Sequence, residues 1–118
     1  MTTYNAGDVV LVRFPFTDLR SSKKRPALIL SPAEYSARYG DVVVMGMTSQ
    51  EQPEKELALS DWRQAGLPKQ TWLKPVVATL SSAVVQRRLG SLSEADRVCA
   101  VGTLRQMIAT KFLMGKDR

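Results

Sequence analysis

Short runs of apolar and β-branched residues, each ended by glycine, proline or a polar turn, fill most of this chain and most constrain its fold. Runs of this length and composition are typical of β-strands. None is long enough to span a membrane. We therefore expect a small, curved, mostly antiparallel sheet or partly open barrel. The predicted strands are residues 9–14, 26–31, 42–47, 57–59, 71–73 and 76–80, with Lys74-Pro75 between the last two or bulging from them.

Helices are expected mainly after the strands. Ser93, with Asp96 three residues later, predicts an N-cap. The apolar residues that follow at spacings of three and four predict one apolar helix face, ended by Gly115; they are Val98, Val101, Leu104, Ile108 and Phe112. Strands followed by a terminal helix place residues 1–118 in the α+β class as one domain.

Shorter helical elements are also expected between the strands. Residues 31–35 predict a turn with one helical turn at most, and residues 51–56 a loop. Ser60-Asp61 could cap a short helix over residues 62–65. Ser81 or Ser82 could cap another, which would carry Val84, Val85 and Leu89 and end at Gly90.

Charge and composition narrow the possible functions. The 118 residues include 17 Lys and Arg against 11 Asp and Glu, for a formal net charge of +6. A basic chain of this size favours a polyanionic partner such as nucleic acid, although many basic domains are simply well solvated.

Several kinds of chemistry lack the residues they need. The chain has no histidine and only one cysteine, Cys99, and it lacks a glycine-rich phosphate loop and a carboxylate cluster. We therefore expect no metal site and no small-molecule cofactor. The lone cysteine, and an N-terminus without a signal-peptide pattern, predict a cytoplasmic protein.

Basic residues gather ahead of the second predicted strand. They are Arg20, Lys23, Lys24 and Arg25. Arg25 precedes Pro26 at the strand entrance, where it would be anchored while the loop before it moves. An anchored guanidinium can present its planar fork to a phosphate. The same residues could equally form a solvated loop that contributes only charge.

Two further places combine hydroxyl, aromatic and basic side chains. Thr48-Ser49 ends the third predicted strand, where hydroxyls can bind a phosphate or cap a turn. Thr71 and Lys74 flank Trp72, and together they could stack and hold single-stranded RNA. Trp72, like Trp62, can equally belong to the core.

In this order, three stretches resemble the MazF/PemK family of toxin endoribonucleases from bacterial toxin–antitoxin systems. They are Gly-Asp-Val-Val at residues 7–10, Lys-Arg-Pro-Ala at 24–27 and Leu-Gly-Ser-Leu-Ser at 89–93. The strand ending in Thr48-Ser49, the 71–74 segment and the pairs Gly66-Leu67 and Thr79-Leu80 fall where the family has them. The resemblance spans nearly the whole chain. It implies an SH3-like barrel with attached helices, usually a homodimer, whose RNA groove a cognate antitoxin blocks.

The resemblance also implies an activity. Members cut single-stranded RNA at short sequences without a metal, which inhibits translation and growth. The 2′-hydroxyl attacks the adjacent phosphate and leaves a 2′,3′-cyclic phosphate and a 5′-hydroxyl. Arg25 matches the family's catalytic arginine and Thr48 its catalytic threonine. The residues expected to bind RNA are Arg20, Lys23, Lys24, Ser49, Thr71 (often serine in relatives) and Lys74 (often arginine).

Two departures from the family keep alternatives open. Some relatives carry a histidine, or an aspartate-glutamine pair, in the groove, and this chain has neither near Lys74. Arginine stays protonated near neutral pH, so Arg25 is better suited to stabilise charge than to act as a base. The alternatives are a non-catalytic barrel that binds nucleic acid or protein, and a gyrase-directed toxin of the same fold that acts through its C-terminal residues.

Overall fold

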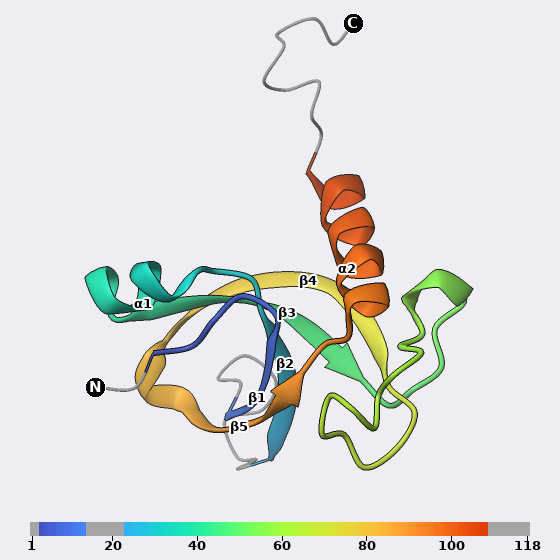
Figure 1. Ribbon diagram of the computed structural model, residues 1–118, viewed down its shortest axis with the longest axis horizontal. Coiled ribbons are helices and arrows are strands. Elements are labelled where there is room, and N and C mark those ends of the chain that lie inside the picture. Colours follow the sequence, from blue (N-terminus) through green and yellow to red (C-terminus); the bar gives the residue numbers. More distant parts are fainter. Residues whose placement is uncertain (1–2, 14–22, 109–118) are drawn as a thin grey trace, which may run out of the picture.

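The computed structural model describes residues 3–13 and 23–108 of the chain. Five strands form one antiparallel sheet in the order β4-β3-β2-β1-β5. The strands are β1 (Asp8–Arg13), β2 (Lys24–Ile29), β3 (Asp41–Thr48), β4 (Trp72–Ser81) and β5 (Val85–Ser91). The sheet curls so that its edge strands β4 and β5 approach around one end without pairing into a closed barrel (Figure 1). The predicted α+β fold with a small barrel-like sheet is confirmed.

Two helices accompany the sheet. Helix α1 (Ala33–Tyr39) joins β2 to β3, and α2 (Glu94–Met107) follows β5. Single 3₁₀ turns lie at Lys55–Leu57 and Ser82–Val84. Within residues 3–13 and 23–108, no helix combines the length and apolarity needed to cross a membrane.

Both faces of the sheet are buried, each under its own hydrophobic cluster. The inner cluster draws on all five strands, so the curled sheet largely encloses it by itself. It consists of Tyr4, Val10, Val12, Ala27, Ile29, Val42, Val44, Leu80 and Val85. Because β1 contributes to both clusters, its sequence is an unbroken apolar run instead of an alternating one.

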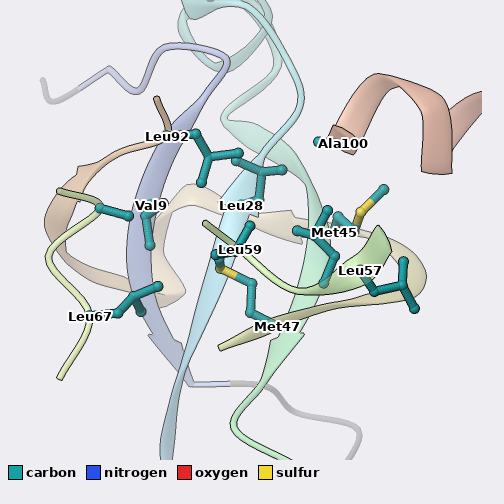
Figure 2. Packing of buried hydrophobic residues seen from close by; sticks show 11 residues of the cluster. Val9, Leu28, Met45, Met47, Leu57, Leu59, Leu67, Leu92 and Ala100 are labelled. Carbon is teal, nitrogen blue, oxygen red and sulfur yellow. The ribbon is translucent and has the colours of Figure 1, made fainter. Parts of the chain in front are cut away.

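The outer cluster lies on the opposite face, beneath the segment of residues 49–71 that links β3 to β4. Figure 2 shows Leu57, Leu59 and Leu67 of that segment packed over Val9, Leu28 and Met47 of the strands, with Ala100 of α2 at the edge. The linking segment approaches β5 very closely: a Cβ on Gly66, whose φ is +80°, would lie 2.0 Å from the Leu89 carbonyl oxygen. The second layer of the fold is therefore an irregular segment plus α2.

Some of the predicted boundaries are wrong. Strand β2 begins at Lys24 instead of Pro26, because pairing with β1 continues to Arg25–Val12 and Lys24–Arg13. Helix α1 extends to Tyr39, where at most one helical turn was expected. Segments 71–73 and 76–80 form one strand, β4, whose bulge falls one residue later than the predicted Lys74-Pro75. Met45 pairs with Val77 and Gly46 with Lys74, so Pro75 and Val76 are extra.

Three predicted elements are of the wrong type. The helix expected over Val84, Val85 and Leu89 is a 3₁₀ turn followed by β5, because pairing with β1 satisfies this backbone and suits its β-branched residues. In place of the strand expected at 57–59, the structure has the end of the 3₁₀ turn Lys55–Leu57 and one isolated bridge, Ala58–Trp72. The helix expected at 62–65 is only a turn, closed by a hydrogen bond from Ala65 N to Asp61 O.

Helix α2 has the predicted N-cap but not the predicted packing. Ser93 Oγ accepts a hydrogen bond from Asp96 N at 3.2 Å. However, Val98, Val101 and Ile108 are 68%, 48% and 57% exposed, and the helix buries Asp96, Ala100 and Thr103. The helix ends at Met107, with Ile108 as its extended C-cap, so the predicted end at Gly115 is wrong. Two other predictions, the end of the first strand at residue 14 and the apolar position 112, lie outside the described residues.

Candidate nucleic-acid interface

Arg25 lies at the start of β2 and is exposed to solvent. Side chains alternate along a strand, so Arg25 shares a face with Ala27 and Ile29 of the inner cluster. It pairs across the sheet with the fully buried Val12. Arg25 therefore forms the rim of the inner cluster, with its backbone held in the sheet.

Thr48 ends β3 on the same rim. The last pair of the β2–β3 ladder is Ala27–Gly46. Continued two residues beyond that pair, the same register sets Arg25 across from Thr48, and strand alternation assigns both side chains to the inner face of the sheet. Both residues therefore lie at the same end of neighbouring strands, although 23 positions separate them in the sequence.

Lys74 completes this arrangement from β4. It pairs with Gly46, and a Cβ on Gly46 would lie 3.5 Å from the Lys74 Cβ. The absent side chain at Gly46 therefore leaves room beside the exposed lysine. The bulge at Pro75 and Val76 follows directly, a feature that re-aims strand side chains near functional sites. We call Arg25, Thr48 and Lys74 the strand-end cluster.

The hydroxyl of Thr48 already has one hydrogen bond. Its Oγ1 accepts from Gln50 N at 3.1 Å, which fixes the turn after β3. A hydroxyl that accepts this bond keeps its own proton to donate. The turn-capping and phosphate-binding interpretations of Thr48 are therefore compatible.

More positive charge surrounds the cluster. Arg13 and Lys24 are opposite each other in the β1–β2 ladder, and both are exposed, as are Lys23 and Ser49. Like charges directly opposite one another destabilise a sheet, and an anion between them removes that cost. The predicted RNA contact at position 20 lies outside the described residues.

Thr71 is placed differently from the prediction. It is only 3% exposed, and its Oγ1 donates to Lys69 O at 2.9 Å. Because Thr71 and Leu73 are two residues apart, both point to the outer face of the sheet. The predicted RNA contact by Thr71 does not fit this burial, and its hydroxyl instead fixes the approach to β4.

Both tryptophans have structural contacts. Trp72 and Trp62 are half-buried against the outer cluster, and the Arg63 guanidinium lies 4.7 Å from the Trp62 ring centroid. Cys99 is a half-buried free thiol. Among the described residues, no three side chains of the His, Cys, Asp and Glu type gather as metal ligands would.

Two residues of the site were missed by the sequence analysis. Gly46 was treated only as part of a strand, although a glycine inside an apolar strand can indicate a bulge or a close approach. Gln50 follows Thr48-Ser49 in the sequence, and no local pattern distinguishes it from the other glutamines. Its connection to Thr48 is visible only in the hydrogen bond.

A curled antiparallel sheet with cationic and hydroxyl side chains along one rim defines a small barrel protein suited to a polyanionic partner. Comparison of the sequence with known protein families identifies the family. The family of PemK-like, MazF-like toxins of type II toxin–antitoxin systems matches residues 5–108. The chain therefore belongs to this family.

Solved structures share the fold at low sequence identity. Crystal structures of MazF and of MazE–MazF from Deinococcus radiodurans align with TM-scores of 0.72 and 0.74 at 22% and 21% identity. They cover 98% and 92% of this chain, and 99% and 98% of theirs. An endoribonuclease in complex with its cognate antitoxin, from a mycobacterial species, aligns with a TM-score of 0.66 at 18% identity over 91% of this chain and 94% of its own. Among curated proteins, none matched the sequence.

Proposed function

We propose that this protein is a toxin that cleaves single-stranded RNA at the strand-end cluster. The observation that carries the proposal is the register of β2 and β3, which, continued two residues past the Ala27–Gly46 pair, sets Arg25 across from Thr48 at one rim of the sheet. Membership in the MazF-like toxin family and the fold shared with a mycobacterial endoribonuclease support it.

In the proposed reaction the 2′-oxygen of a nucleotide attacks the adjacent phosphorus. The new 2′-O–P bond forms as the bond from phosphorus to the 5′-oxygen breaks, which gives a 2′,3′-cyclic phosphate and a 5′-hydroxyl. Arg25 faces the phosphate and stabilises the charge that develops on its oxygens, a strong electrostatic contribution when the cation is fixed in advance. Its backbone pairing in β2 supplies that fixation.

Thr48 and Lys74 assist in different ways. Thr48 donates its remaining proton to an oxygen of the scissile phosphate, while Lys74 binds a neighbouring phosphate as a point charge. Ser49, Lys23, Lys24 and Arg20 guide the flanking backbone. Because arginine stays protonated near neutral pH and the chain has no histidine, solvent takes up the proton of the 2′-oxygen and supplies the proton that the leaving 5′-oxygen gains. The rate then depends on positioning and charge.

The proposed assembly is a homodimer that works in the cytoplasm and is inhibited by a cognate antitoxin. The exposed apolar face of α2 supports the dimer, since Val98, Val101 and Ile108 are more than 45% exposed. A groove of about 300 Å³ runs beside this face, between α2 and the turn at Ala6-Gly7. Contiguous apolar surface of this kind is typical of protein–protein contacts.

The dimer is tested by molar mass in solution. Wild type is expected to be a dimer, and Val98→Lys with Val101→Lys a folded monomer. Gln64→Lys with Gln86→Lys, which adds the same two positive charges at exposed positions outside α2, is the control and stays dimeric. A monomeric wild type, or a double variant that remains dimeric, contradicts this assignment of α2.

The cleavage proposal is tested by incubating the wild-type protein with a long single-stranded RNA in EDTA and sequencing the new ends. We expect new 5′-hydroxyl ends whose partners carry cyclic phosphate. A non-catalytic barrel would bind the RNA with steep salt dependence but produce no new ends. A toxin directed at gyrase would leave the RNA intact and act on that protein. Either result, or cleavage that requires a divalent ion, contradicts the proposal.

A further inference from the structure

Gln50, two residues beyond Thr48, is held in place on both sides of its backbone. Its N–H donates to Thr48 Oγ1 at 3.1 Å, and its carbonyl accepts from Gln52 Nε2 at 3.0 Å. Both bonds are made by side chains in an exposed turn, where backbone groups usually bind water. The turn therefore presents residue 50 in a defined position beside the Thr48 hydroxyl.

The side-chain amide of Gln50 remains available. The residue is exposed, and within the described part of the chain its amide makes no hydrogen bond. The neighbouring Gln52 is half-buried, and its amide is already engaged with the Gln50 carbonyl. Gln50 thus carries the uncommitted amide nearest to the proposed catalytic hydroxyl.

An amide has the right chemistry to read a base. It offers a donor and an acceptor in one plane, which can pair with two adjacent groups on a base edge. Single-stranded RNA exposes its Watson–Crick and Hoogsteen edges to contacts of this kind. A side chain on a fixed backbone loses less freedom on binding than one on a mobile loop, which favours discrimination.

We propose that Gln50 is a specificity-determining residue that recognises one base next to the scissile phosphate. This proposal rests on the proposed function and adds to it the group that selects where the RNA is cut. Arg25 and Thr48 act on the phosphate that every nucleotide carries, whereas the amide of Gln50 distinguishes bases.

The experiment compares cleavage-site preferences on a random-sequence single-stranded RNA library, read from sequenced 5′-hydroxyl ends. Wild type is expected to prefer one base at a position beside the cut. In Gln50→Ala that preference should fall about tenfold at that single position. In Gln50→Glu it should shift towards bases that present a donor. Gln86→Ala removes an exposed amide on β5, which β1 and β2 separate from β3 in the sheet, and should keep the wild-type profile.

The outcomes separate the two proposals. If Gln50→Ala, with an unchanged circular dichroism spectrum, keeps the wild-type base profile, then Gln50 does not read a base and the cleavage proposal stands. Cleavage by wild type without any base preference beside the cut has the same meaning. If wild type produces no 5′-hydroxyl ends, the proposed function itself is wrong and the Gln50 assignment is lost with it.

Discussion

The strand-end cluster and the surroundings of Asp96 are two polar regions that use their hydrogen-bonding groups in opposite ways. Asp96 is 1% exposed, and its two carboxylate oxygens accept from Ser60 N and Asp61 N, both at 2.9 Å. It ties α2 to the segment that covers the outer cluster. Arg25 and Lys74, by contrast, are exposed charges on backbones that pair within the sheet.

The difference shows how structural and functional polar groups can be told apart in one small fold. A buried carboxylate is tolerated when its acceptors are satisfied, and removing it leaves buried donors without partners. An exposed cation on a rigid strand contributes little to folding but is ready to bind. We therefore expect substitutions near Asp96 to change stability, and substitutions in the strand-end cluster to change activity.

The largest effect is expected for Asp96→Ala. It removes two charge-assisted hydrogen bonds to the backbone of Ser60 and Asp61, each contributing about 1.5–3 kcal/mol. The free energy of unfolding in urea should fall by about 3–4 kcal/mol, whereas Asp96→Asn, which keeps the shape and one acceptor, should lose about half as much. A loss below about 0.5 kcal/mol in Asp96→Ala would mean that the contact does not hold the segment.

Thr48→Val is the counterpart in the strand-end cluster. It keeps the shape of the side chain and removes the hydroxyl, so stability should stay within about 0.5 kcal/mol of wild type. Single-turnover cleavage of RNA should fall about ten- to a hundredfold, since a donor to the reacting phosphate is lost. Thr48→Ser should retain most of the rate. Equal rates for Thr48→Val and wild type would remove Thr48 from the reaction.

Ser93→Ala is a smaller change beside Asp96, and it should again affect stability and leave activity unchanged. The Ser93 hydroxyl caps α2 by accepting from Asp96 N. Its loss should cost about 1 kcal/mol of unfolding free energy, typical of an N-cap. Cleavage by the folded variant should match wild type. A large loss of activity without a loss of stability would show that α2 influences the rim directly.

The sequence predicted the elements of the site better than their arrangement. It located Arg25 and Thr48 at strand ends, because turn residues mark strand ends locally. It could not supply the register that sets them face to face, because register depends on packing between distant segments. The burial of Thr71 also depends on long-range structure. Thr71 shares the outer face of the sheet with Leu73, and the linking segment covers that face along a path that no local pattern reveals.

The errors in secondary structure have similar causes. Ser81 and Gly90 are good helix-end signals, and they outweighed the β-branched Val84 and Val85 in the prediction. These residues form strand β5 instead of a helix because their backbone pairs with β1. On α2 the apolar spacing correctly predicted a helix, but the face it marks is exposed and the buried face carries Asp96 and Thr103. An apolar helix face identifies a contact surface without saying what covers it.

The central claim is that a fixed cation at the rim of the inner cluster performs the chemistry, and Arg25→Ala tests it most directly. Cleavage and RNA binding should be measured separately, with Arg87→Ala as the control. Arg87 is also exposed, but it pairs with Leu11 and so lies on the other face of the sheet. We predict that Arg25→Ala lowers the single-turnover cleavage rate at least a hundredfold, about 2.7 kcal/mol, with binding reduced far less. Arg87→Ala should keep the rate. Near wild-type cleavage by Arg25→Ala, or an equal loss in both variants, would contradict the account.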